Sequence, residues 1–251
     1  MSDLLIVIVN YKTPGLTIDC LRSLEPELAA VPSTRVVVTD NLSGGDSVQQ
    51  IGAAIAANNW GSWATLMPLP RNGGFAYGNN EGIRPALESA EPPRYVWLLN
   101  PDTLVKPGAI RAMIDFLDAD PKVGIAGTRV INEDDTVRRS AFRFHTAASE
   151  FEAGLRLGVV SKLLSDKVVA QPIPTTACEV DWVSGASMFV RPEDVAKQIP
   201  CGPDLDAVLE AVKPYLEAGF TDVAIVQVGD EGQSRFLDQA AKPLLEKLRA
   251  A

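Results

Sequence analysis

The sequence lacks several features that would place it in a membrane or in an oxidising compartment. No apolar run approaches the ~20 residues that a transmembrane helix requires. Its three cysteines are an odd number without metal-ligand spacing, which argues against a disulfide framework and a zinc site. Residues 1–3 lack the basic residues that precede the apolar part of a signal peptide. These absences predict a cytoplasmic protein.

Positive charge is also scarce. Lysine and arginine number 23 against 32 aspartates and glutamates, for a net charge of −9. Nucleic-acid binding depends mainly on positive charge, so we expect no nucleic-acid partner. A phosphate-bearing ligand would need a metal ion or a local cluster of donors. The length of 251 residues fits one large α/β domain, alone or with an appendage.

The rest of the chain is organised around the apolar segment 95–99 and the polar turn that follows it. A continuous apolar run of this length is typical of a strand buried on both faces. Pro101 predicts the end of that strand, which leaves Asp102 just past its carboxyl end. Ligands of open α/β sheets bind at that edge, and a carboxylate there suits Mg²⁺ or Mn²⁺ carrying substrate phosphates. The alternative is a turn aspartate that caps the following helix.

Strands and helices alternate through most of the chain. This alternation predicts an α/β fold with a mainly parallel sheet flanked by helices. Helices are predicted after Gly15, after Ser47, from the end of the segment 71–80 to about Ala90, and over residues 108–118 and 147–164. Strands are predicted at residues 4–9, 35–39, 64–69, 95–99 and 123–130, with two short extended pieces within 179–191.

Three of these strands end at polar residues, and a glycine-rich segment (71–80) enters from a fourth place. In this order the segments resemble the family-2 glycosyltransferases of the GT-A fold, which is Rossmann-like, and particularly their rhamnosyltransferase-like branch. The resemblance covers about residues 4–199, and we take residues 1–199 as the GT-A domain. The motifs that carry it are VIVNYKTPG, VVVTDNLSGGDS, RNGGFAYGNNEGIR, YVWLLNPDTLVKPGAI and VDWVSGASMFVR.

The resemblance implies a nucleotide site and a metal site. Asp40 matches the aspartate that hydrogen-bonds the base or ribose, with Asn10 and Tyr11 lining the same pocket. Asp102 matches the last residue of the family's Asp-x-Asp metal motif, while Asn100 takes its first position. One carboxylate together with the diphosphate is adequate for Mg²⁺ or Mn²⁺, but the metal should bind weakly without nucleotide.

The glycine-rich segment is expected to contact the donor as well. Gly73 and Gly74 let the backbone approach the ligand closely. Asn72 and Asn79 can hydrogen-bond the sugar or the diphosphate, and Phe75 belongs to the same group.

Some of these residues could instead have purely structural roles. Tyr11 and Phe75 fit equally well as core aromatics, and Gly73-Gly74 as a tight turn. Arg71 and Lys106 fit better as solvated charges. His145, the single histidine, follows an arginine-rich stretch (138–143) and is expected at the surface.

The chain departs from the family on the acceptor side. Trp182, Ser184 and Gly185 match the acceptor-side segment, but the family's later acidic pair, which supplies the general base, has no counterpart. The segment 193–194 falls too early and fits better as the acidic first turn of a helix opened by Pro192. No catalytic residue is therefore identified.

From about residue 201 the sequence resembles the C-terminal end of luciferase-like, deazaflavin-dependent oxidoreductases, which are (β/α)₈ barrels. A helix (205–216), a strand (222–228) and a second helix (236–248) are predicted, so residues 200–251 form an αβα appendage. A barrel needs eight strands, so this piece cannot form a cofactor site alone.

The resemblance implies inverting, metal-dependent transfer of a sugar from a dTDP- or UDP-sugar to a hydroxyl group. The acceptor would be a saccharide or a lipid-linked saccharide, and the latter would bring the protein to the inner face of the membrane. One alternative is a nucleotide-sugar-binding module without turnover. A deazaflavin-dependent oxidoreductase is the other, supported by the tail alone.

Overall fold

The structure is a computed structural model. It describes residues 3–144, 168–193 and 241–250, together with residues 146, 149, 151, 154, 205, 206, 209, 210, 212 and 213. In this part of the chain no helix is both long enough and apolar enough to cross a bilayer.

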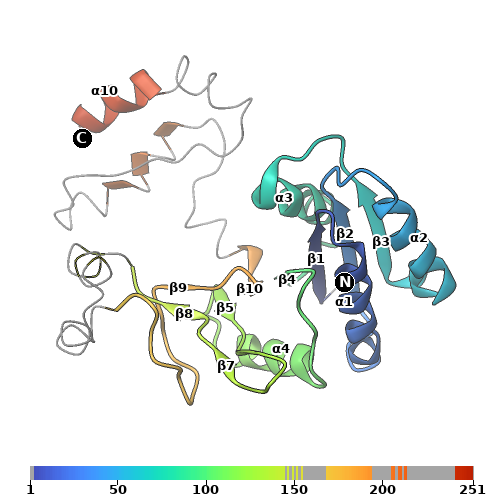
Figure 1. Ribbon diagram of the computed structural model, residues 1–251. Coiled ribbons are helices and arrows are strands. Elements are labelled where there is room, and N and C mark those ends of the chain that lie inside the picture. The colour runs from blue at the N-terminus through green and yellow to red at the C-terminus, as the bar shows by residue number, and fades with distance from the viewer. Residues whose placement is uncertain are drawn as a thin grey trace.

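A six-stranded sheet forms the centre of the fold (Figure 1). Its strands are β1 (Leu4–Asn10), β2 (Thr34–Asp40), β3 (Ala64–Pro68), β4 (Tyr95–Leu99), β5 (Ile125–Gly127) and β10 (Ser187–Val190). They are arranged in the order β3-β2-β1-β4-β10-β5. The first four are parallel, and β10 lies antiparallel between β4 and β5. The prediction of a mainly parallel sheet is confirmed.

Helices cover both faces of this sheet. On one face α1 (Pro14–Leu28), α2 (Ser47–Ala57) and α4 (Ala109–Ala119) pack against alternate strand residues such as Ile6 and Trp97. On the other, α3 (Gly74–Leu87) packs against Val7 and Val96. Successive strand residues point to opposite faces, which explains why the apolar runs are continuous. A 3₁₀ turn, η1 (Trp60–Ser62), precedes β3.

Two small sheets continue the chain beyond β5. One pairs β6 (Val130–Ile131) with β7 (Val137–Arg138), and the other pairs β8 (Ala141–Phe142) with β9 (Trp182–Val183). The predicted strand 123–130 is therefore wrong as one element, because β5 and β6 belong to different sheets. The chain leaves the central sheet at Gly127, where a Cβ atom would lie 2.7 Å from the Cβ of Val183.

Several sequence predictions fall partly or wholly outside the described residues. They include His145, the tail strand 222–228, and most of the helix 147–164. In the tail, α10 (Lys242–Ala250) overlaps the second predicted helix, and the described residues of 205–213 are helical. Lys247 of α10 pairs with Asp206, so these two segments contact each other.

Two glycines of α3 face the sheet, so the helix packs there without intervening side chains of its own. A Cβ atom at Gly82 would lie 2.8 Å from Val7 Cγ1 and 3.2 Å from Thr39 Cγ2. At Gly78 it would lie 2.7 Å from Val9 Cγ1. This close contact fixes the N-terminal end of α3, which carries the glycine-rich segment.

Replacing Gly82 by alanine is expected to lower the free energy of unfolding by about 1 kcal/mol. Overpacking against Val7 and Thr39 costs about 1–3 kcal/mol, and the higher helix propensity of alanine offsets about 1 kcal/mol of it. Urea denaturation followed by circular dichroism measures the change. The matched control is Gly15→Ala in α1, where nothing lies within 4 Å of the added methyl group. Equal stability of the two variants would show that α3 packs less closely than the structure indicates.

Candidate functional site

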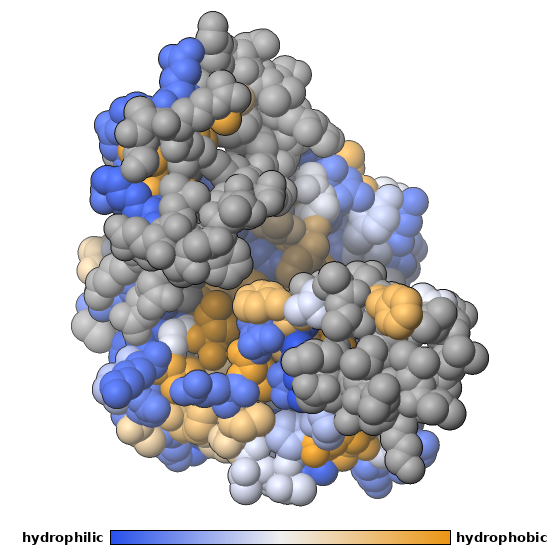
Figure 2. Space-filling view, turned by 90° about the vertical axis from the view of Figure 1, so that its left-hand side faces the viewer, coloured by the Kyte–Doolittle hydropathy of each residue, from blue (hydrophilic) through white to orange (hydrophobic). Residues whose placement is uncertain are grey.

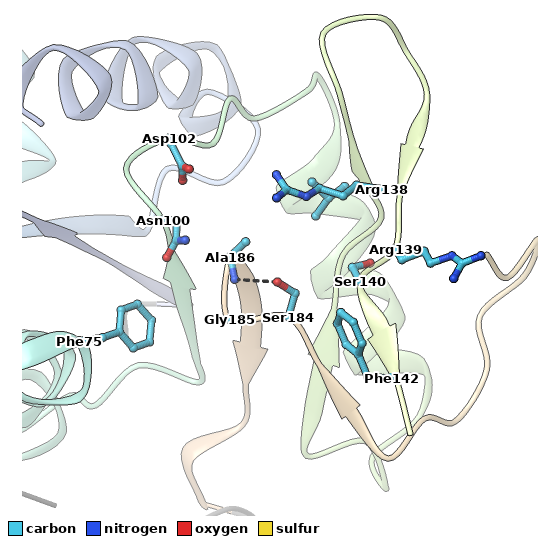
Figure 3. Close-up of a pocket in the computed structure, with 11 residues that line it drawn as sticks. Phe75, Asn100, Asp102, Arg138, Arg139, Ser140, Phe142, Ser184, Gly185 and Ala186 are labelled. Atoms are coloured by element: carbon cyan, nitrogen blue, oxygen red, sulfur yellow. Dashed lines mark hydrogen bonds between the residues drawn. The ribbon is translucent and has the colours of Figure 1, made fainter. Parts of the chain in front are cut away.

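A cavity of about 610 Å³ lies at the carboxyl end of β4 (Figure 3). Its walls come from the start of α3, the turn after β4, the β6–β8 region, and the loop between β9 and β10. The lining mixes polar and apolar side chains, and Figure 2 shows hydrophilic and hydrophobic residues side by side on one face of the molecule. The lining residues are Phe75, Asn100, Asp102, Val130, Arg138, Arg139, Ser140, Phe142, Ser184, Gly185 and Ala186.

Asp102 and Asn100 offer oxygen atoms to this cavity. Among the described residues, neither side chain has a hydrogen bond or an ion pair. The Asn100 backbone is fixed, because its N–H donates to Ala186 O at 2.9 Å.

The negative charge of Asp102 also affects the ionisation of a neighbouring thiol, that of Cys20. Burial, and secondarily this charge, raise the pKa of the nearby Cys20 thiol to about 12.

Asp102 does not cap the helix that follows it. The N-terminus of α4 is instead capped from α1, where the Glu27 carboxylate accepts hydrogen bonds from Gly108 N at 2.8 Å and Ile110 N at 3.2 Å. Ser23 Oγ accepts another from Val105 N at 2.9 Å. The turn is thus anchored by α1, and the carboxylate of Asp102 is left available for a ligand.

Asp40 is the centre of a buried hydrogen-bond network at the ends of β1 and β2. Its Oδ2 atom accepts hydrogen bonds from Asn10 Nδ2 at 2.6 Å, Ser43 Oγ at 2.7 Å and Ser47 Oγ at 3.3 Å. Its Oδ1 atom accepts one from Ser43 N at 2.9 Å. The residue is 2% exposed, so these internal donors satisfy the carboxylate.

Asn10 belongs to the same network. It is fully buried, and its Oδ1 atom accepts a hydrogen bond from Thr17 Oγ1 at 2.9 Å. A contact from Asn10 or Asp40 to a base stays a prediction. In this structure both side chains hold the ends of the strands together.

Tyr11 and Phe75 are not core residues. They are 43% and 48% exposed, so the alternative that placed them in the core is wrong. Phe75 lines the cavity. The pKa of the Tyr11 hydroxyl is lowered by its contacts with Lys12 and Asn72, which places this ring beside the glycine-rich segment.

The conformation of the glycine-rich segment depends on Asn41, which we did not predict as a site residue. The Asn41 amide donates to Asn72 Oδ1 at 2.9 Å and to Gly74 O at 3.1 Å, and its Oδ1 accepts from Gly73 N at 3.3 Å. Gly74 has a φ of 81°, which favours glycine. Asn79, by contrast, is 3% exposed and donates to Phe75 O.

The structure thus brings some of the predicted site residues together in one cavity: Phe75, Asn100, Asp102, Ser184 and Gly185. A neighbouring group at the ends of β1 and β2 contains Asn10, Tyr11, Asp40, Asn72, Gly73 and Gly74. Sequence reasoning missed Arg138, Arg139, Ser140 and Phe142 on the opposite wall. The arginine-rich stretch was visible in the sequence, but nothing there placed it opposite Asp102.

Trp182 supports this wall without lining the cavity. Its ring stacks on Phe142 at 4.1 Å between centroids, and its Nε1 donates to Arg143 O at 3.0 Å.

Within the described residues, Asp102 is the one carboxylate that lines the cavity. The described part of the chain also holds no cluster of three histidine, cysteine or carboxylate side chains that could bind a metal by themselves. A cation at Asp102 would take its other ligands from water, from a bound substrate or from residues outside the described part of the chain.

Known proteins resemble this chain in sequence and in fold. The family described as "Glycosyl transferase family 2" matches residues 5–165, which is more than half of the chain. No curated protein matches this chain. Mannosyltransferase PcManGT from Pyrobaculum calidifontis, solved with GDP-Man and Mn²⁺, has a TM-score of 0.51 at 14% identity, covering 99% of this chain and 73% of that one.

Two further solved structures are more distant in fold. S. aureus TarS 1–349 with UDP-GlcNAc has a TM-score of 0.42 at 16% identity, over 57% of this chain. This chain spans 38% of that protein. Glucosyl-3-phosphoglycerate synthase from Mycobacterium tuberculosis with UDP has a TM-score of 0.44 at 12% identity, over 98% of this chain and 80% of that one.

Asp40→Asn is expected to destabilise the protein by about 1.5–3 kcal/mol, the usual contribution of a hydrogen bond to a charged group. The amide has one acceptor oxygen instead of two, so it cannot accept both from the donors at Oδ2 and from Ser43 N. Urea denaturation measures the loss. Asp46→Asn is the control, since Asp46 is exposed and caps no backbone group. We expect that change to cost less than about 0.5 kcal/mol. An Asp40→Asn protein as stable as Asp46→Asn would contradict the assignment of Asp40 as a buried centre.

Proposed function

Because this chain belongs to glycosyl transferase family 2 and has the GT-A fold, we propose that it transfers a sugar from a nucleotide-sugar to a hydroxyl acceptor. The observation that supports this most strongly is the carboxylate of Asp102, which lies beside Asn100 at the carboxyl end of the central strand and has no ion pair or hydrogen bond to any described residue. Open α/β sheets bind their ligands at that edge.

The donor would extend from the ends of β1 and β2 to the end of β4. The nucleoside would lie near Tyr11 and the segment that Asn41 holds, and the diphosphate near Asn100 and Asp102. The base and ribose would lie at the strand ends beside Asp40, whose own carboxylate is buried among internal donors. We propose a dTDP- or UDP-sugar, with inversion at the transferred carbon.

The residues fit a hard divalent cation. Mg²⁺ and Mn²⁺ take oxygen ligands, and Asp102 and Asn100 offer such atoms without competing partners among the residues that the structure describes. When bound, the cation would stabilise the negative charge of the departing diphosphate. A single carboxylate makes a weak site, so metal and nucleotide should bind together. The fold relative PcManGT was itself solved with GDP-Man and Mn²⁺, which supports this proposal.

The acceptor would enter from the side of Ser184 and Gly185, which form the wall between β4 and the small sheets. We propose a saccharide or lipid-linked saccharide. Its hydroxyl group must lose a proton, but the described lining offers no second carboxylate to take it. This favours one alternative, a nucleotide-sugar-binding module with little turnover. The oxidoreductase alternative is supported by the tail resemblance alone.

Metal and nucleotide are expected to stabilise the protein together. UDP-sugar with Mn²⁺ should raise the melting temperature more than UDP-sugar with a chelator, because only the ternary complex fills the Asp102 site. Asp102→Asn should abolish this difference without changing the melting temperature of the free protein. The control is Asp115→Asn, an exposed carboxylate on α4 that pairs with Arg111. Equal stabilisation with and without metal in the unmodified protein would reject the metal site.

Turnover is expected to be slow and to rise with pH. A positioned general base contributes about 10²–10⁴-fold, and without one the rate depends on acceptor already deprotonated in solution. Release of nucleoside diphosphate, measured between about pH 6 and pH 9, should therefore increase without a plateau. Fast transfer with a flat profile at neutral pH would show that another carboxylate, such as one in the tail, acts as the base. Tight donor binding with no release would support the binding module.

A further inference from the structure

The wall opposite Asp102 carries a positive charge. Arg138 and Arg139 both line the cavity, but Figure 3 shows that they differ in direction. The Arg138 side chain points across the cavity toward Asp102, while Arg139 points away. Among the described residues, neither guanidinium group has an ion pair or a hydrogen bond, even though the chain has a net charge of −9.

Backbone hydrogen bonds fix this wall relative to the end of β4. Asn100 N donates to Ala186 O at 2.9 Å, and two residues earlier Ser184 N donates to Ser140 O at 3.0 Å. Ser140 Oγ also donates to Thr128 O at 3.2 Å. Arg138 lies two residues before Ser140 and pairs with Val130 in the small sheet. The position of Arg138 opposite Asp102 is therefore built into the fold.

A guanidinium group without a partner among the described residues suits an anionic ligand better than a neutral hydroxyl group. The guanidinium group forms paired, charge-assisted hydrogen bonds with phosphate oxygens. The diphosphate of the donor is assigned to the opposite wall, where Asp102 and a cation would hold it. A second anionic group must then belong to the other substrate.

We infer that Arg138 binds a phosphate group of the acceptor, so that the acceptor is a phosphorylated saccharide, either free or linked through phosphate to a lipid. This inference rests on the proposed function, because it assigns the donor to the Asp102 side. It also gives a reason for the directions of the two arginines. Arg138 recognises the acceptor, and Arg139 serves as its natural control.

Calorimetric titration with inorganic phosphate tests this assignment on the full chain. Phosphate should bind both to the free protein and to protein saturated with UDP and Mg²⁺. Arg138→Gln should weaken phosphate binding about tenfold, the effect of one charge-assisted hydrogen bond. Arg139→Gln should leave it unchanged, and neither change should alter the affinity for UDP. Arg138→Lys, which keeps the charge but loses the paired geometry, should restore binding in part.

Three results would overturn the inference. Competition between phosphate and UDP, with weaker UDP binding by Arg138→Gln, would place Arg138 on the donor diphosphate. Equal effects of the two glutamine variants would mean that the wall attracts anions without a specific site. Unchanged phosphate binding in Arg138→Gln would remove its role altogether. Failure of the unmodified protein to bind UDP would count against the proposed function instead, since the titration without nucleotide still tests Arg138.

Two further phosphate probes distinguish an acceptor phosphate that is linked to a lipid from one on a free saccharide. A long-chain dialkyl phosphate held in vesicles of neutral lipid presents a membrane-linked phosphate, and glucose 6-phosphate presents a free one. Weaker binding of either probe by Arg138→Gln supports the assignment and identifies the source. If Arg138→Gln binds both probes as tightly as the unmodified protein does, the assignment is contradicted.

Discussion

The hydrogen bond from Asn10 Nδ2 to Asp40 Oδ2, 2.6 Å long, holds the carboxyl ends of two neighbouring parallel strands together. It joins the carboxyl ends of β1 and β2, and Ser47 connects the same carboxylate to the start of α2. A carboxylate that is 2% exposed is stable only when donors surround it, so these polar residues constrain one another. The positions of Tyr11 and Asn41, which come next in the chain, follow from this network.

The second constraint is the insertion of β10 beside β4. This strand runs antiparallel to its neighbours and returns the chain to the central strand from a distant part of the sequence. The stacking of Trp97 on Phe189, with 4.5 Å between centroids, and the bond from Trp97 Nε1 to Ser187 Oγ at 2.9 Å fix the pairing. The loop before β10 consequently lies against Asn100. The candidate acceptor wall is therefore attached directly to the strand that carries Asp102.

Much of the central sheet was predictable because its strands are buried on both faces. A continuous apolar run such as residues 95–99, followed by polar turn residues, is typical of a central strand in a parallel sheet. The polar ends of the parallel strands then had to share one edge. Short strands were less predictable. The pattern of residues 123–130 predicts one strand, but they divide between two sheets because β9 crosses closely at Gly127.

The α/β class, the order of the first four strands along the chain and the carboxyl-end position of Asp102 follow from the sequence alone. Local apolar patterns and turn residues were sufficient for these, since each depends on neighbours in the sequence. Which side chains meet, by contrast, depends on the tertiary structure. It buried Asp40 among internal donors, gave Glu27 rather than Asp102 the role of capping α4, and set Arg138 opposite Asp102. These contacts join residues far apart in the chain, and the pairing of β10 with β4 and of the small sheets has no local pattern that encodes it.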